Sequence, residues 1–281
     1  MKAYVSIDLE GLPGISGISQ VAPKASLYSD ARKVMTWITN VVSRQLLREG
    51  FEYVTVADSH GYMGNIDYME VTEKVELIQG YPRPYSMMIG IDEGYDAALM
   101  IGYHARAGTA KGFLDHTYSS ATIHRIYVNG VAASEYYLNT LYAGYYDVPV
   151  ILVAGDEHLR EEVEKHTPWA VFVPLKKGYS RLSAKYPSRD IIEKKLAEGI
   201  REASRRLKRG EAKPLKLGEL TLRIELKNPL FVDMAQLIPG IKRIDAYTLE
   251  YKARDSVEAM SIVEIIAWIG LAGSSILERA R

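Results

Sequence analysis

Short apolar runs alternate with longer amphipathic segments over the first two-thirds of the chain. An apolar run bounded by turn-forming residues is typical of a buried strand. Between Ser29 and Gly50, the residues Val34, Ile38 and Val41 recur at helical spacing, which predicts a helix that packs on a sheet. Strands separated by such helices pair in parallel through right-handed crossovers. The predicted strands lie at about residues 3–7, 53–57, 75–77, 97–102, 150–153 and 170–173, and the predicted helices at about 29–50, 135–146, 157–165 and 189–208.

The pattern changes near Lys208–Pro214, a polar stretch with a glycine and a proline. Beyond it, apolar residues alternate from Leu220 to Leu226, which is typical of a half-buried strand, and an isoleucine-rich helix is predicted at about 255–271. We therefore predict an α/β fold with a mostly parallel sheet flanked by helices, forming a catalytic domain over residues 1–209. A smaller α+β unit is predicted over residues 210–281.

Composition narrows the classes of partner. The chain has 35 basic and 35 acidic residues and no cysteine. The balanced charge gives no reason to expect nucleic acid or an anionic membrane as a partner. The lack of cysteine excludes disulfides, thiolate zinc sites and a cysteine nucleophile, and it fits a reducing cytoplasm. With no recognisable signal peptide and no apolar run judged long enough to span a bilayer, we expect a cytoplasmic protein.

Side chains suited to chemistry follow several predicted strands at the point where each strand ends. Asp8 and Glu10 follow the first strand and, two residues apart on extended chain, point to the same side. Asp58 and His60 follow the second strand, and His104 follows a later one. Because ligand sites in parallel α/β sheets lie outside the carboxyl ends of the strands, we expect these side chains to share one edge.

Glu135 reaches the same region by another route. Asn129-Gly130 between the apolar segments 123–128 and 131–133 predicts a hairpin, and a helix that Ser134 caps begins directly after it. A carboxylate at a helix N-terminus is favoured by the helix dipole. Taken on its own, Glu135 is therefore better explained as a helix cap than as a metal ligand.

Together these residues predict a metal site. Two neighbouring buried carboxylates repel each other and are costly to leave unpaired, and a cation removes both costs. Histidine nitrogen and carboxylate oxygen without thiolate suit zinc, with manganese or cobalt as alternatives. Five candidate ligands exceed the need of one catalytic zinc with an open position, and they suit two metals that share a carboxylate. Each residue taken alone has an ordinary structural explanation, so the prediction depends on the joint pattern.

Two further residues are candidates for catalysis. His116 lies in a glycine-containing loop soon after His104 and could transfer protons. Arg106 could hold a substrate carboxylate or neutralise an oxyanion, although an ordinary surface arginine is an equally good interpretation. The remaining histidines, His124, His158 and His166, are predicted to be structural or superficial.

The opening Ser6-Ile7-Asp8-Leu9-Glu10-Gly11 resembles the S-x-D-x-E-G sequence of the zinc D-aminopeptidases, the DppA family. Shorter matches follow in order over most of the first 160 residues. They are Asp58-Ser59-His60, the run from Gly102 to Ala107, the run from Ala143 to Val150, and Ala154-Gly155-Asp156.

The resemblance implies a two-zinc aminopeptidase that acts on small peptides with a D-residue at the free N-terminus. It implies that Asp8, Glu10, His60, His104 and Glu135 bind two zinc ions per subunit, with Asp8 as the bridging carboxylate. It also implies a homo-oligomer, a decamer that encloses its active sites. We then expect His116 to accept or return the proton and Arg106 to stabilise the oxyanion.

Two other interpretations remain. Two-metal sites also serve phosphoesterases and other amidohydrolases, so hydrolysis of a phosphate ester or of another amide is the alternative within the enzymes. A metal-stabilised peptide-binding protein without turnover is the alternative from a different class.

Overall fold

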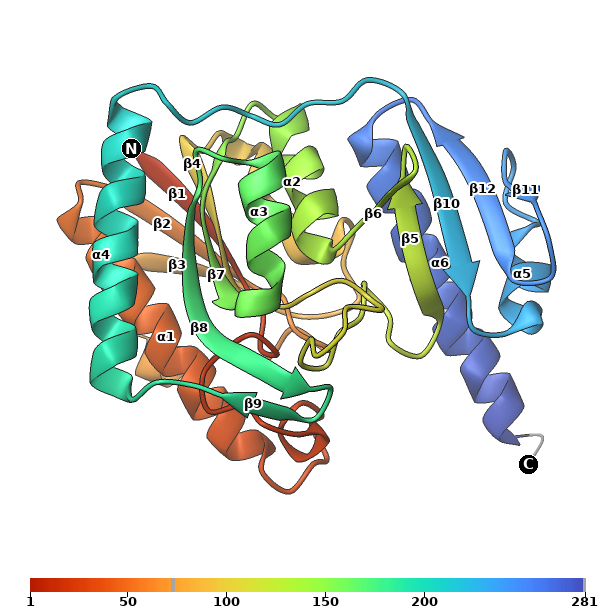
Figure 1. Cartoon of the computed structure of the whole chain (residues 1–281), viewed down its shortest axis with the longest axis horizontal. Helices are drawn as coiled ribbons and strands as arrows, with labels where there is room; N and C mark the ends of the chain where they lie inside the picture. Colours follow the sequence, from red (N-terminus) through yellow and green to blue (C-terminus); the bar gives the residue numbers. More distant parts are fainter. Residues whose placement is uncertain (72–73, 280–281) are drawn as a thin grey trace.

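The computed structural model describes residues 1–71 and 74–279 and, within them, contains two sheets (Figure 1). The larger has the strand order β3-β2-β1-β4-β7-β8-β9, and its pairs are parallel except the edge pair of β8 and β9. This confirms the predicted α/β class. The strands are β1 (Lys2–Ile7), β2 (Tyr53–Asp58), β3 (Val75–Ile78), β4 (Ala97–Tyr103), β7 (Val150–Asp156), β8 (Val171–Ser180) and β9 (Ser183–Lys185).

Helices cover both faces of this sheet, as continuous apolar strands require. On one face, α1 (Tyr28–Arg48) and α4 (Arg189–Lys208) pack against each other and against the strands. On the other face lie α2 (Glu135–Tyr145) and α3 (Arg160–His166). The central strands β1, β4 and β7 therefore have apolar layers on both sides, and their carboxyl ends are held at one edge.

The second sheet is antiparallel and has the order β11-β12-β10-β5-β6. Its strands are β5 (Ile123–Val128), β6 (Val131–Ala132), β10 (Leu220–Leu226), β11 (Lys242–Arg243) and β12 (Thr248–Ala253). The predicted hairpin at Asn129-Gly130 is confirmed. However, β5 and β6 come from the stretch predicted as the first domain, so the smaller unit is built from two separate parts of the chain.

Two helices complete this unit, α5 (Pro229–Ala235) and α6 (Ser256–Arg279). Helix α6 packs on β10, β12, α5 and α2, and thus joins the two sheets. Five short 3₁₀ helices occur in the described ranges: η1 (Ile18–Gln20), η2 (Tyr68–Glu70), η3 (Ser86–Met88), η4 (Ile91–Glu93) and η5 (Glu157–Leu159).

Helix α6 corrects two expectations. It continues to Arg279, well beyond the predicted end at residue 271. Its most apolar 18-residue stretch has a mean hydropathy of 1.8, so by length and composition alone the helix could cross a membrane, contrary to the expectation that no segment would be long and apolar enough. Its Val263 and Ile266 are buried in the protein, whereas Leu271 and Ile276 are about half exposed. Figure 1 shows its C-terminal end extending beyond the second sheet.

Candidate metal centre

The end of β1 places Asp8 and Glu10 beside the end of β4. The Asp8 amide donates to the Ile101 carbonyl at 2.8 Å, and the Gly11 amide donates to the Gly102 carbonyl at 2.7 Å. A Cβ on Gly11 would lie 2.2 Å from the nearest carbonyl oxygen of β4, so only glycine permits this approach. Both carboxylates are buried as a result.

His60 and His104 approach these carboxylates from the ends of β2 and β4. His60 Nδ1 lies 2.8 Å from Glu10 Oε2 and 3.5 Å from Asp8 Oδ1. His104 Nε2 lies 3.5 Å from Asp8 Oδ2 and 3.4 Å from Glu135 Oε2. The structure therefore brings together all five residues that the sequence suggested as ligands.

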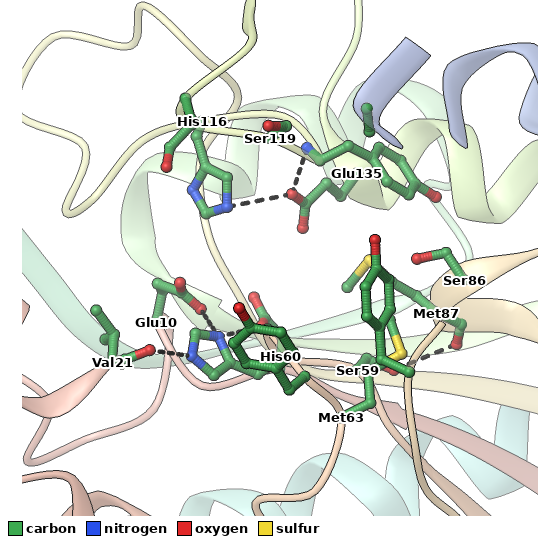
Figure 2. A pocket seen from close by; sticks show the side chains of 18 of the residues that line it. Glu10, Val21, Ser59, His60, Met63, Ser86, Met87, His116, Ser119 and Glu135 are labelled. Carbon is green, nitrogen blue, oxygen red and sulfur yellow. Dashed lines mark hydrogen bonds and ion pairs between the residues drawn. The ribbon is translucent and has the colours of Figure 1, made fainter. Parts of the chain in front are cut away.

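Glu135 is the first residue of α2, and its second oxygen faces the loop that carries His116. Its Oε1 accepts a hydrogen bond from the Tyr118 amide at 2.7 Å and lies 3.5 Å from His116 Nε2. The His116 ring stacks on that of His104 with their centroids 4.2 Å apart. Figure 2 shows His116 and Glu135 on one side of the cavity, opposite Glu10 and His60.

Backbone carbonyls fix which nitrogen of each histidine faces the carboxylates. His60 Nε2 lies 2.7 Å from the Val21 oxygen, and His104 Nδ1 lies 3.0 Å from the Ala105 oxygen. His116 Nδ1 lies 2.8 Å from the Leu114 oxygen. A carbonyl can only accept, so each of these nitrogens is the donor and the other nitrogen presents a lone pair in the neutral ring. Histidines that bind metals are oriented in the same way.

The cluster is electrostatically incomplete without a cation. Asp8 Oδ2 and His104 Nε2 are buried and have no hydrogen-bond partner in the described chain. Burial, and then the neighbouring Glu10, raise the pKa of Asp8 to about 8. Burial alone would lower the pKa of His104, but Glu135 and Asp8 raise it to about 10. Without a metal, these carboxylates and imidazoles share protons, and a bound cation could take the place of those protons.

The spacing of these atoms fits a metal. Two ligand atoms bound at about 2.1 Å to one tetrahedral zinc lie about 3.4 Å apart. The contacts of Asp8 with each histidine and of His104 with Glu135 match this separation. The donor set of imidazole nitrogen and carboxylate oxygen therefore fits zinc in both chemistry and spacing.

Two charged residues that the sequence indicated near the site, Asp58 and Arg106, lie outside this cluster. Asp58 accepts hydrogen bonds from Asn65 and Ile66, so it organises the loop after His60 and does not face the ligands. Arg106 does not line the cavity, and its charge acts on Glu162, where it opposes the rise in pKa that burial causes. This arrangement gives no support to the prediction that Arg106 stabilises an oxyanion.

The cavity in front of the cluster has a volume of about 410 Å³. It lies between the carboxyl edge of the larger sheet and helix α6 of the smaller unit. Its walls come from four of the cluster residues, from the loops after β1, β2 and β3, from the loop that carries His116, and from α6. The lining residues beyond the cluster include Tyr62, Tyr81, Met87, Tyr118, Glu264, Trp268 and Leu271.

Two charged residues near the cluster were not predicted from the sequence. Lys176 in β8 is buried, and its Nζ donates to the carbonyls of Glu10 and Ile15 at 2.6 Å each. Burial lowers its pKa to about 7. Glu264 of α6 lines the cavity and is also buried. A charged residue within an otherwise apolar strand or helix face was the available signal for both.

Nearly the whole chain is similar to proteins described as D-aminopeptidases. The Peptidase_M55 family model, described as D-aminopeptidase, matches residues 1–265. A D-aminopeptidase of Bacillus subtilis (strain 168) is 32% identical over 273 residues, which cover 96% of this chain and 98% of that protein. A solved structure, described as the Zn-dependent D-aminopeptidase DppA from Bacillus subtilis, a self-compartmentalizing protease, superposes with a TM-score of 0.91 at 31% identity. That match covers 96% of this chain and 98% of that one.

Proposed function

The chain belongs to the D-aminopeptidase family, and from this membership we propose that it is a zinc-dependent metallopeptidase that removes the N-terminal residue, preferably a D-residue, from small peptides. The observation that carries this proposal is the buried cluster of carboxylates and histidines, in which Asp8 Oδ2 and His104 Nε2 lack partners. When bound there, zinc would supply a Lewis acid that polarises a carbonyl and lowers the pKa of water.

We propose that the site holds two zinc ions per subunit, with Asp8 shared between them. The two oxygens of Asp8 face different partners: Oδ1 faces His60, and Oδ2 faces His104. Glu10 lies on the His60 side, and Glu135 lies on the His104 side. This division supports one ion held by Asp8, Glu10 and His60, and a second held by Asp8, His104 and Glu135.

His116 is proposed to move the proton. Its Nδ1 donates to the Leu114 carbonyl, so Nε2 carries the free lone pair and points toward Glu135 at the cavity wall. A group held this way can accept a proton and return it to the leaving amine. Because Glu135 Oε1 and the stacked His104 ring fix the imidazole, His116 needs no rearrangement between the two transfers.

The size of the cavity supports small substrates. A volume of about 410 Å³ lies at the lower end of the range for small-molecule sites, and aromatic side chains form much of its wall. We propose that it admits a dipeptide or a similarly short peptide and excludes folded chains.

We propose further that the protein acts in the cytoplasm as a homo-oligomer, a decamer by its resemblance to the family. A relative described as self-compartmentalizing supports association. The half-exposed Leu271 and Ile276 on α6 are apolar side chains that a neighbouring subunit could cover. Sedimentation at working concentration should give a single large species, and a stable monomer with full activity would contradict this part of the proposal.

The experiment that tests the activity combines metal analysis with a substrate panel. Purified protein should contain about two divalent ions per chain, and it should hydrolyse D-aminoacyl dipeptides faster than their L-counterparts. A chelator should abolish turnover, and added zinc should restore it. Metal-loaded protein that cleaves p-nitrophenyl phosphate but no D-aminoacyl anilide would refute the proposed substrate class, and tight peptide binding without turnover would refute an enzyme.

A further inference from the structure

A peptide that enters the cavity by its free N-terminus brings an ammonium group with it. Glu264 is a carboxylate that lines this cavity outside the metal cluster. Four carboxylates of the described chain line the cavity: Asp8, Glu10, Glu135 and Glu264. The first three belong to the metal cluster. Glu264 comes from α6, on the wall formed by the second unit, and is only 6% exposed.

One oxygen of Glu264 is held and the other is unpaired. Oε2 accepts a hydrogen bond from the Tyr85 amide at 2.8 Å. Tyr85 and Ser86 both have positive φ, 57° and 44°, a conformation that turns successive amides toward one anion. The carboxylate is therefore fixed in orientation, while Oε1 is buried without a hydrogen-bond partner in the described chain.

No cation from the described chain occupies this position. Neither lysine nor arginine lines the cavity. Arg83 is the basic residue whose charge acts on Glu264, but its three nitrogens donate to the carbonyls of Ser86, Ile78 and Asp58. An unpaired carboxylate oxygen in a buried wall is costly, and a ligand with a protonated amine would remove this cost.

Glu264 and the metal cluster line the same cavity, and a chain of contacts links the two walls. Ser86 and Met87, which follow Tyr85, line the same cavity. The Met87 carbonyl accepts a hydrogen bond from Ser59 Oγ at 3.2 Å, and Ser59 directly precedes His60 (Figure 2). A ligand that fills this cavity therefore faces both the metal cluster and Glu264 of the α6 wall.

We propose that Glu264 is the specificity-determining residue that binds the protonated α-amino group of the substrate, an inference that rests on the proposed aminopeptidase function. It assigns the amine to a carboxylate of the second unit and not to a metal. A charge-assisted hydrogen bond of this type corresponds to about tenfold to a hundredfold in affinity. Peptides with a blocked N-terminus lose this contact.

The test uses zinc-loaded full-length protein and two probes, the phosphonic acid analogue of D-alanine and its N-acetyl derivative, measured by titration calorimetry. Wild-type protein should bind the free amine at least tenfold more tightly than the acetylated form. Glu264→Gln keeps an oxygen for the Tyr85 amide but loses the charge, and it should reduce that ratio to about twofold. Glu258 lies on the same helix as Glu264 but outside the cavity, and its carboxylate accepts hydrogen bonds from Tyr251 and Arg254. Glu258→Gln should therefore leave the ratio unchanged.

With D-alanyl-D-alanine as substrate, Glu264→Gln should raise KM about tenfold or more at unchanged zinc content, with a smaller effect on kcat. Glu264→Asp should recover part of the loss. The proposal is overturned if wild-type protein shows no preference for the free amine, if Glu264→Gln retains the preference, or if that variant weakens both probes equally. A preference that Glu264→Gln abolishes, in a protein that cleaves no peptide, would uphold Glu264 and refute the aminopeptidase function instead.

Discussion

Glu264 should also make the stability of the ligand-free protein depend on pH in a characteristic way. Burial raises the pKa of this carboxyl from 4.5 to about 7, against the opposing effects of the Tyr85 and Ser86 amides and of Arg83. Because the folded-state pKa lies above the unfolded value, the protonated carboxyl contributes its full stabilisation below about pH 4.5. That contribution is lost as the pH rises through about 7.

The magnitude follows from the size of the shift. A shift of about 2.5 units at 1.36 kcal/mol per unit corresponds to about 3 kcal/mol in all. About 2 kcal/mol of it falls between pH 5.5 and 8.5, because part of the titration lies below this window. Glu264→Gln has no titrating group at this position. The wild-type protein should therefore lose about 2 kcal/mol more of its unfolding free energy than the variant across this window.

The measurement is urea unfolding of both proteins at several pH values, with matched metal content and without substrate. The difference between the two free energies cancels the titration of every other group that both proteins share. Glu258→Gln serves as the control, since its difference from wild type should not follow this course. A Glu264→Gln difference that stays constant from pH 5.5 to 8.5 would show that Glu264 is not held as an unpaired carboxylate, and the reasoning from its surroundings would be wrong.

Four other substitutions probe the cluster and the lysine beside it. Glu10→Ala and His60→Ala should each lower both the zinc content and the rate, and full metal occupancy in either variant would remove that residue from the ligand set. His116→Ala should cut turnover about a hundredfold or more with zinc content unchanged; loss of zinc would make His116 a ligand, and near-normal turnover would leave it structural. Lys176→Met leaves the carbonyl of Glu10 and that of Ile15 without a donor, so thermal unfolding should detect a loss of about 1–3 kcal/mol, and unchanged stability would contradict this role.

The residues of the cluster could be predicted because strand geometry decides their position. Parallel strands end at a common edge, so Asp8, His60 and His104 had to approach one another once the strand order was known. Glu135 could be placed with them through the hairpin at Asn129-Gly130. Strand ends and a two-residue hairpin are set by the local sequence, so contacts made elsewhere in the chain do not displace them.

Features that depend on distant contacts were not predictable in the same way. Glu264 reaches the cavity because α6 packs against α2, and no local pattern in the helix indicates that contact. The chain also continues as helix from residue 271 to Arg279, beyond the predicted end. The first helix begins at Tyr28, one residue before its predicted start, with Leu27 in the N-cap position. Helix ends are set by small energies that packing can outweigh.

The pairing of β5 with β10 has a consequence for the order in which the protein forms during synthesis. Leu222 pairs with Val128 across more than ninety intervening residues, so the hairpin of β5 and β6 leaves the ribosome long before its partner strand. Until β10 arrives, the apolar side chains of Ile126 and Val128 lack their cover and β5 presents an open edge, a surface prone to non-native association. Glu135 follows this hairpin directly, and Glu264 lies C-terminal to β10. The two walls of the cavity that carry these residues therefore reach their final positions only after β10 and α6 have been synthesised. The catalytic chamber is therefore among the last parts of the molecule to become functional.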